Sequence, residues 1–386
     1  MSHFLNEEQM LIQNSVREFC NDPAIKALAA KDNQREPGTL EENCWKEVVK
    51  MGYLGAWVPE EYGGMGYSLT TYLVILEELT RNGFPGAGPM TCQDLAMLPI
   101  AYWGTREQKE KFLLPMASGK VNACGAVTDP AGLGNFAEWG LTVTEDGEDY
   151  VLNGAKVCVT SPHISDVKVV FGRADNSDFS SSVYYVEKGM PGLETGFREK
   201  KIMDSLSDWG TIYMKNLRVP KINRVVDNGF GSAWMGPSYL NVAIMALTMC
   251  ENAFNMTLKF TQQRTRYGRP LTDLQRVSHR LVDFAIRNEN IRSLIYTAAR
   301  LWDEERYQES TRLCSMAKIY ATEAASASLH DATVLHGGVG FTAQAGIGRM
   351  WMGTMGLEIA EQPPDVHRDI VAKTFGIREG WKNGQQ

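Results

Sequence analysis

The hydrophobic period changes twice along this chain, and that double change constrains the fold more than any other feature. Apolar residues recur at helical spacing from residue 1 to about 120, alternate from about 121 to 225, and return to helical spacing from about 231. Alternation indicates half-buried strands, whereas a spacing of three to four residues indicates amphipathic helices. The chain is therefore predicted to be an α+β protein with three domains, at 1–120, 121–230 and 231–386.

The two helical segments carry clear start signals and long apolar stripes. Asn6 is a predicted N-cap, and Thr105 with Gln108 three residues later has the capping-box pattern. In the last third, residues 271–305 and about 311–335 are predicted as two long helices. The first of these has an apolar stripe made of Leu274, Val277, Leu281, Phe284, Ile291, Ile295 and Ala298.

The middle segment has the turn chemistry of antiparallel strands. Asp146-Gly147 separates two alternating arms in LTVTEDGEDYVLNGAKVCVTS, which predicts a hairpin. Further strands are predicted at VKVVFG, SSVYYVE and TIYMKNLRVP. Short strands closed by turns favour a small antiparallel barrel or sandwich.

Charge and cysteine usage exclude several classes of protein. The net charge is −7, without a long Lys/Arg run, so no nucleic-acid partner is expected. No stretch approaches about 18 uninterrupted apolar residues, so no membrane span is expected. The first residues are those of an acidic amphipathic helix rather than a signal or transit peptide. Seven scattered cysteines without a CxxC pair favour reduced thiols and a cytoplasmic location.

Two polar segments in the last third are candidates for phosphate binding. QQRTRYGRPL, residues 262–271, places Arg264, Arg266 and Arg269 beside Tyr267 at a helix corner, where forked guanidinium donors suit a pyrophosphate. A solvated helix end explains the same residues. The glycines of LHGGVGFT, residues 335–342, suit either a backbone phosphate contact or an ordinary helix C-cap.

Hydroxyl residues end two of the predicted strands. Thr128 in VTDPAGLGN and Thr160 in KVCVTS could donate to a ring carbonyl or nitrogen, but taken alone these residues favour a structural role in a strand and a turn. His336 and His367 have no companions at metal-ligand spacing, so no metal site is predicted. No strand–GxGxxG–helix unit is present, which argues against a nicotinamide-binding Rossmann domain.

Taken together, these segments resemble the acyl-CoA dehydrogenase family over essentially the whole chain. The resemblance is carried, in order, by GYLGAWVPEEYGGMGYS, WGTREQKEKFLLPMASGK, AVTDP with YVLNGAKVCVTS, TIYMKNLRVP, QQRTRYGRPLTDLQ and LHGGVGFT. It implies an N-terminal helical domain, a middle antiparallel β-barrel and a C-terminal four-helix bundle. It also implies an FAD flavoprotein that forms a homotetramer, built as a dimer of dimers, or a heterotetramer.

The resemblance also implies where FAD binds. The residues matched to flavin positions are Thr128, Gly134, Cys158, Thr160, Arg264, Tyr267, Gly337 and Gly338. Thr128 and Thr160 would meet the isoalloxazine. Arg264 and Tyr267 would reach the adenine and pyrophosphate side from a neighbouring subunit, along with the two glycines.

The family carries a catalytic glutamate roughly twenty residues beyond its glycine pair. Counting without a gap from Thr342 in GGVGFT places Glu361, within EIAEQPPDVHRD, at that position. The carboxylate would remove the α-proton of an acyl-CoA thioester while the β-hydride passes to flavin N5. A dry pocket would raise the pKa of Glu361 and strengthen it as a base.

Several positions depart from the family pattern. A serine that touches flavin and CoA is replaced by Gly134, the following aspartate by Asn135, and the indole beside the flavin by Cys158. A substrate-binding arginine aligns near Tyr239, and the alternative base of some subfamilies would fall near Ser238 and is absent. Asn135 and Tyr239 are therefore the candidate substrate-binding residues.

These departures leave alternatives open. The first hypothesis is an acyl-CoA dehydrogenase that passes electrons to an electron-transfer flavoprotein. The others are a flavin oxidase, an enoyl-CoA reductase working in the reductive direction, and a subunit of a heteromeric dehydrogenase. The residues do not identify the acyl group.

Overall fold

The structure of the chain is a computed structural model, which describes residues 5–31, 39–132, 139–173, 181–202, 208–226 and 235–377. Its contacts divide the chain into two compact units. The helical unit comprises Met1–Glu18, Leu73–Gly83 and Gly236–Glu379. Among the described residues, the sheet unit comprises the segments Phe19–Tyr72 and Phe84–Met235. The division at 1–120, 121–230 and 231–386 stays a prediction.

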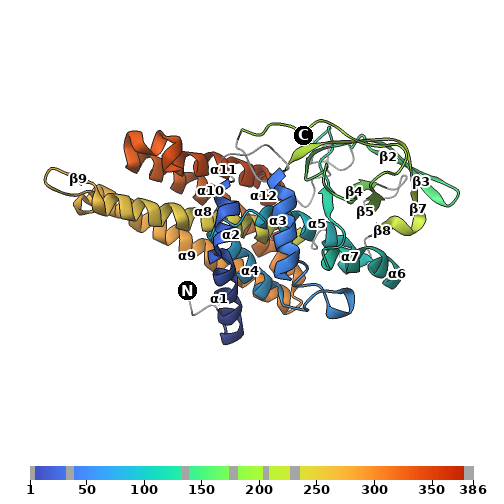
Figure 1. Cartoon of the computed structure of the whole chain (residues 1–386), viewed down its shortest axis with the longest axis horizontal. Coiled ribbons are helices and arrows are strands. Elements are labelled where there is room, and N and C mark those ends of the chain that lie inside the picture. The colour runs from blue at the N-terminus through green and yellow to red at the C-terminus, as the bar shows by residue number, and fades with distance from the viewer. Residues whose placement is uncertain are drawn as a thin grey trace. The chain divides into compact units, whose positions relative to one another are not determined.

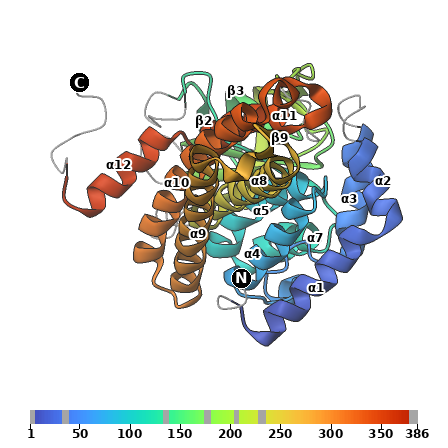
Figure 2. The same cartoon turned by 90° about the vertical axis from the view of Figure 1, so that its left-hand side faces the viewer.

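Three long helices dominate the helical unit. They are α8 (Gly236–Gln263), α9 (Gln275–Asp303) and α10 (Tyr307–His336), which run side by side in Figures 1 and 2. Two shorter helices, α11 (Ile347–Ile359) and α12 (Pro364–Thr374), pack against α10. Most of α1 (Glu7–Asn21) and of α4 (Leu69–Arg81) also belongs to this unit. The predicted long helices are thus confirmed.

The apolar stripe predicted on α9 is buried along almost its whole length. Phe284 is 1% exposed, and Ile291 and Ile295 are 0% exposed, whereas Leu274 at the start of the stripe is only partly buried. Burying each such large side chain stabilises the fold by roughly 1.5–3 kcal/mol. The buried residues of α10 include small ones such as Ala317, Ala321 and Ala325, which allow neighbouring helices to approach closely.

Both predicted helix caps are present. The Asn6 side chain accepts from the Gln9 N–H at 2.8 Å, and the Gln9 side chain accepts in return from the Asn6 N–H at 3.1 Å. Thr105 and Gln108 form the same reciprocal pair at the start of α6 (Arg106–Gln108). Each box satisfies two N–H groups that a helix start otherwise leaves unpaired.

The sheet unit combines short helices with two four-stranded sheets. Its further helices are α2 (Pro23–Lys31), α3 (Thr39–Met51), α5 (Ala87–Trp103) and α7 (Leu114–Ala117). One sheet has the order β1-β4-β5-β8 and the other has the order β2-β3-β7-β6. The strands are β1 (Ala123–Ala126), β2 (Thr142–Asp146), β3 (Asp149–Thr160), β4 (Val167–Arg173), β5 (Ser181–Glu187), β6 (Leu193–Thr195), β7 (Trp209–Pro220) and β8 (Arg224–Val226).

The sheets differ from the predicted antiparallel barrel in two respects. Strand β1 pairs with β4 in parallel, so the first sheet is mixed. Within the described residues, the two sheets do not join into one closed barrel. The hairpin predicted at Asp146-Gly147 is confirmed, since β2 and β3 are antiparallel neighbours and Gly147 has a φ of 61°. The parallel pair arises because the chain leaves β1 and returns through the whole β2–β3 hairpin before β4 begins.

The core of this unit lies between the two sheets. Side chains of β3 and β7, including Leu152, Ile212 and Leu217, pack in one buried cluster with Tyr184 and Val186 of β5. Strand β3 therefore has one buried face, which extends to Val159 near its end. Among the described residues, no helix is long and apolar enough to cross a membrane.

Candidate active site

Glu361 lies in a tight turn between two helices of the helical unit. Helix α11 ends at Ile359, and α12 begins at Pro364, with Pro363 as its N-cap. Glu361 and Gln362 adopt φ values of 51° and 77°, in the left-handed region. This conformation costs roughly 1–2 kcal/mol for each residue other than glycine, so the surroundings must hold it in place. Two consecutive strained residues mark this turn, which we call the carboxylate turn, as a candidate functional site.

The carboxylate of Glu361 is held by the start of α8. The Ser238 hydroxyl donates a hydrogen bond to it, and Ser238 is itself buried. Burial raises the pKa of the Glu361 carboxyl above its ordinary value, while the Ser238 bond and the positive charge of Lys318 act in the opposite direction. Burial prevails. The result is a carboxylate that is a stronger base than an exposed glutamate.

Three helices hold the carboxylate turn, two through its backbone and one through the Gln362 side chain. Lys318 of α10 donates to the carbonyl oxygens of Glu358 and Gln362, each at 2.6 Å. The Nε2 atom of His367, on α12, lies 2.9 Å from the Glu361 carbonyl oxygen. The Tyr239 hydroxyl of α8 donates to Oε1 of Gln362 at 3.3 Å. The turn is thus fixed from several directions, which explains how its strained conformation persists.

Tyr239 and His367 support each other beneath the turn. Their rings pack edge to face, with the ring centroids 4.5 Å apart, and the side chains of Tyr239 and His367 are 1% and 0% exposed. Burial raises the pKa of Tyr239 and lowers the pKa of His367 to about 4, so both are neutral near neutral pH. The structure brings Tyr239 and Glu361 together as parts of one assembly, with Tyr239 in contact with the turn.

The two strand ends that carry candidate flavin contacts lie next to each other in the sheet unit. The Val157 N–H donates to the Thr128 carbonyl oxygen at 2.9 Å, which joins the segment after β1 to the end of β3. A register shift between Lys156 and Val159 leaves Cys158 with a φ of 57° and an exposed side chain. Thr128 and Thr160 are partly buried on either side of this bulge. The bulge therefore places the exposed Cys158 next to Val157, which bonds to the Thr128 carbonyl, and two residues before Thr160.

The loop after Thr128 is anchored by one carboxylate. Asp129 accepts from the N–H groups of Ala131, Gly140 and Leu141, at 3.0–3.3 Å. Its Oδ2 also lies 3.6 Å from Nζ of Lys156, whose pKa is lowered to about 7 by burial. Gly134 and Asn135 lie outside the described residues.

The remaining candidates gather at the other end of the helical unit. Arg264 and Tyr267 belong to the hairpin of β9 (Thr265–Arg266) and β10 (Arg269–Pro270), which extends from the far end of α8 in Figure 1. Tyr267 is 81% exposed, and its φ is 53°. The rings of Phe260 and His336 stack at 4.2 Å, so Gly337 and Gly338 lie close to the same end. At Gly337 the φ of 61° requires glycine, and both glycines face open space.

The length of α8 separates these candidates from Glu361. Ser238 and Tyr239 stand near the beginning of this 28-residue helix, and Arg264 directly follows its end. At 1.5 Å per residue the two ends are about 40 Å apart. One chain therefore does not bring Arg264 to its own Glu361. Among the described residues no group of three or more His, Cys, Asp or Glu could hold a metal ion.

Sequence reasoning missed two of the groups around Glu361. Ser238 was considered only as the place where an alternative base is absent, yet its hydroxyl is a donor to the carboxylate. Lys318 was not singled out. Its position between Cys314, Ala317 and Ala321 on the buried face of α10 was a usable signal, because a lysine on such a face needs polar partners.

Comparison with known proteins gives consistent matches along the chain. Sequence models of the N-terminal, middle and C-terminal domains of acyl-CoA dehydrogenases match residues 6–120, 124–217 and 234–376. The caffeyl-CoA reductase-Etf complex subunit CarC of Acetobacterium woodii is 27% identical, covering 96% of this chain and 98% of its own. The mitochondrial short-chain specific acyl-CoA dehydrogenase of Mus musculus is 28% identical, covering 95% of this chain and 90% of its own.

A solved structure shares the same fold. Butyryl-CoA dehydrogenase from Megasphaera elsdenii superposes with a TM-score of 0.88 at 25% identity, covering 96% of this chain and 98% of its own. The similarity therefore extends over both the helical and the sheet units.

Proposed function

Because the chain belongs to the acyl-CoA dehydrogenase family, we propose that it catalyses FAD-dependent α,β-dehydrogenation of an acyl-CoA thioester, with Glu361 as the base. The observation that carries this proposal is the carboxylate turn. A partly buried glutamate is held there in a strained backbone conformation, with its pKa raised and a hydroxyl donor on its carboxylate. Perturbed carboxylates in strained turns are typical of catalytic bases.

The role of Glu361 follows from the acidity of its target. The α-proton of a thioester is a weak acid, so its removal needs a base whose pKa is raised and whose position is fixed. Ser238 orients the carboxylate, while Lys318, Tyr239 and His367 fix the turn that carries it. When bound, FAD supplies the acceptor that takes the β-hydrogen as hydride. Glu361 retains the α-proton until it is released to solvent.

The residues of this chain fit FAD at two separate places. In the sheet unit, the partly buried Thr128 and Thr160 flank the bulge at Cys158 and suit the flavin ring. In the helical unit, Arg264 offers a forked guanidinium at the same end as the open backbone at Gly337 and Gly338, which suits a pyrophosphate. Since α8 separates Arg264 from its own Glu361, we propose that Arg264 and Tyr267 serve the FAD of a neighbouring subunit.

Exposed apolar side chains support association with further copies of the chain. They lie on α9, at the end of α10, in the following segment and along α11, and Phe341 is 91% exposed. The others are Val282, Ile286, Val334, Val339, Trp351, Met352, Met355 and Ile359. Isolated exposed apolar residues are normal, whereas such a set on neighbouring elements marks an interface. We propose a tetramer built from paired dimers.

The purified protein tests the proposed reaction. We expect a yellow protein whose flavin absorption bleaches when an acyl-CoA is added without oxygen. A panel of thioesters with straight, branched and aromatic acyl groups identifies the substrate class. An electron-transfer flavoprotein should restore the colour faster than air does. Fast recovery in air with peroxide formation contradicts the dehydrogenase and supports an oxidase.

One relative favours a second candidate function. The similarity to a subunit of a caffeyl-CoA reductase-Etf complex raises the reductive direction, in which an enoyl-CoA is the substrate. Glu361 would then donate a proton to the α-carbon. A dithionite-reduced enzyme that is reoxidised by an enoyl-CoA, but is not reduced by any saturated acyl-CoA, would favour this direction.

Replacing Arg264 with alanine tests the pyrophosphate site. A charge-assisted hydrogen bond is worth roughly 1.5–3 kcal/mol, so FAD should bind about 10- to 100-fold more weakly. The measurement is flavin content after gel filtration, followed by titration with FAD. Arg276→Ala is the control, because Arg276 is an exposed arginine at the start of α9. Unchanged flavin content in Arg264→Ala would exclude this role.

A further inference from the structure

Lys318 is a fully buried lysine in the middle of α10. It is 0% exposed, among small neighbours that include Cys314, Ala317 and Ala321. Its Nζ atom donates to the carbonyl oxygens of Glu358 and Gln362, both at 2.6 Å. These carbonyls stand three residues before and one residue after Glu361. A single ammonium group therefore ties together the two sides of the carboxylate turn.

The two carbonyls need such a donor. Glu358 lies in the last turn of α11, where carbonyl oxygens have no partner within the helix and the helix dipole favours a positive charge. The Gln362 carbonyl belongs to the left-handed pair, which no regular hydrogen-bond ladder supports. Hydrogen bonds from a charged donor are about twice as strong as neutral ones. Their loss would free the Glu361–Gln362 pair to relax from its strained conformation.

We propose that Lys318 is a positioning residue for the reaction, which fixes the direction of the Glu361 carboxylate and stabilises its negative charge. This inference rests on the proposed function, in which Glu361 is the base. Lys318 contacts the turn from α10, and it does not contact the thioester in this proposal. Its effect is transmitted through the backbone on either side of Glu361 and through its charge.

Other charged and titratable groups surround the pair. On the elements packed around Glu361 and Lys318 they are Tyr239 and Cys314, the carboxylates Glu323 and Glu358, and His367. Burial lowers the pKa of Lys318 to about 8, and the carboxylates oppose that decrease. Tyr239, Cys314 and His367 are neutral near pH 7, because burial raises the pKa of the first two and lowers that of His367. The positive charge of Lys318 therefore opposes the rise that burial causes in the pKa of the Glu361 carboxylate.

Replacing Lys318 with methionine removes the charge and both hydrogen bonds while keeping an unbranched side chain that is one atom shorter. The pKa of Glu361 should rise, because an opposite charge nearby lowers a carboxyl pKa by about 1–3 units. The acidic limb of the pH profile for flavin reduction should therefore shift to higher pH by about 1–3 units. At its optimum the rate should fall roughly 10²-fold, as expected for a base displaced by about 1 Å.

A second measurement does not depend on turnover. In protein labelled with ¹³C at the glutamate carboxyl carbons, the Glu361 signal is identified as the one missing in Glu361→Gln. Its titration should shift to higher pH in Lys318→Met. A purely structural role for Lys318 would lower the melting temperature and leave this titration unchanged. If Lys318→Met does not fold, Lys318→Gln, which keeps one donor without the charge, should give the same direction of shift.

Two comparisons separate this inference from the proposed function. Thr322→Val is the control, since Thr322 is buried one turn along α10 and its hydroxyl bonds to backbone carbonyls of its own helix. It should leave the pH profile unchanged. The double variant Glu361→Gln/Lys318→Met should lose no more activity than Glu361→Gln alone. An unchanged carboxyl titration and pH profile in Lys318→Met overturns the inference, whereas normal turnover in Glu361→Gln overturns the proposed base instead.

Discussion

Glu361→Gln is expected to reduce flavin reduction by acyl-CoA about 10²- to 10⁴-fold, the contribution typical of a positioned base. The amide has nearly the same shape as the carboxylate and can still accept a hydrogen bond from Ser238. It cannot accept the α-proton near neutral pH. The two left-handed residues, the prolines and the Lys318 bonds to backbone carbonyls all remain. Flavin content and melting temperature should therefore change little.

Stopped-flow absorbance of the flavin under anaerobic conditions measures this loss directly. Asp365→Asn is the matched control, because Asp365 lies four residues further on, in the first turn of α12, with its side chain 95% exposed. That variant should reduce its flavin at the normal rate. If Glu361→Gln also does so, Glu361 is not the base. A colourless Glu361→Gln protein would mean that the residue acts in flavin binding.

Periodicity was sufficient for the elements that are determined locally. The stripe from Val277 to Ala298 predicted α9, and the caps at Asn6 and Thr105 predicted where two helices begin. Such signals depend on residues three or four apart, so they are readable without tertiary structure. The position of Glu361 came instead from the family resemblance, by counting without a gap from Thr342 in GGVGFT. That register stays a prediction until the variant is measured.

Features that depend on distant contacts were not predictable in this way. Strand β1 pairs with β4 only after the chain has passed through the β2–β3 hairpin, so nothing within β1 specifies a parallel partner. The bulge at Cys158 shows as a break in alternation only when β7 is laid beside β3. Lys318 was recognisable as a buried cation, but its partners lie 40 and 44 residues further along the chain.

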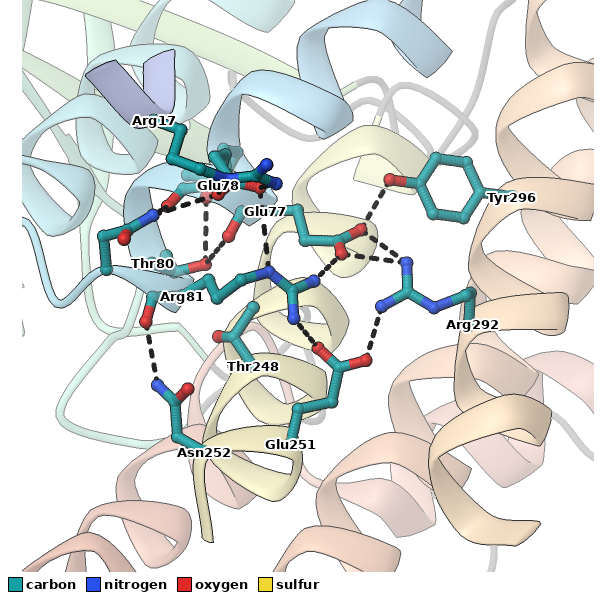
Figure 3. A network of polar contacts seen from close by, with 12 residues as sticks. Arg17, Glu77, Glu78, Thr80, Arg81, Thr248, Glu251, Asn252, Arg292 and Tyr296 are labelled. Carbon is teal, nitrogen blue, oxygen red and sulfur yellow. Dashed lines mark hydrogen bonds and ion pairs between the residues drawn. The ribbon is translucent and has the colours of Figure 1, made fainter. Parts of the chain in front are cut away.

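A second buried cation is expected to matter more for stability than for catalysis. Arg292 on α9 is 4% exposed, and its two Nη atoms lie 2.8 Å from Glu77 and 2.6 Å from Glu251. Figure 3 shows that Arg81 contacts the same two glutamates, so two arginines and two glutamates alternate in a closed ring. The Tyr296 hydroxyl donates to Glu77 at 2.6 Å. The ring joins α4, α8 and α9 within the helical unit.

Arg292→Met should lower the free energy of unfolding by about 3–5 kcal/mol, the cost typical of leaving a buried charge without its partner. Glu77 and Glu251 would then share only Arg81, and one negative charge would remain buried without compensation. Urea denaturation measures the change, and the double variant Arg292→Met/Glu251→Gln should regain part of it, because the surplus charge is removed.

Arg306→Met is the control. Arg306 also pairs with two glutamates, Glu304 and Glu309, but on the surface, where water screens each charge. Equal effects of the two substitutions would mean that the ring contributes no more than a surface ion pair, and that apolar packing alone holds α4 against α8 and α9.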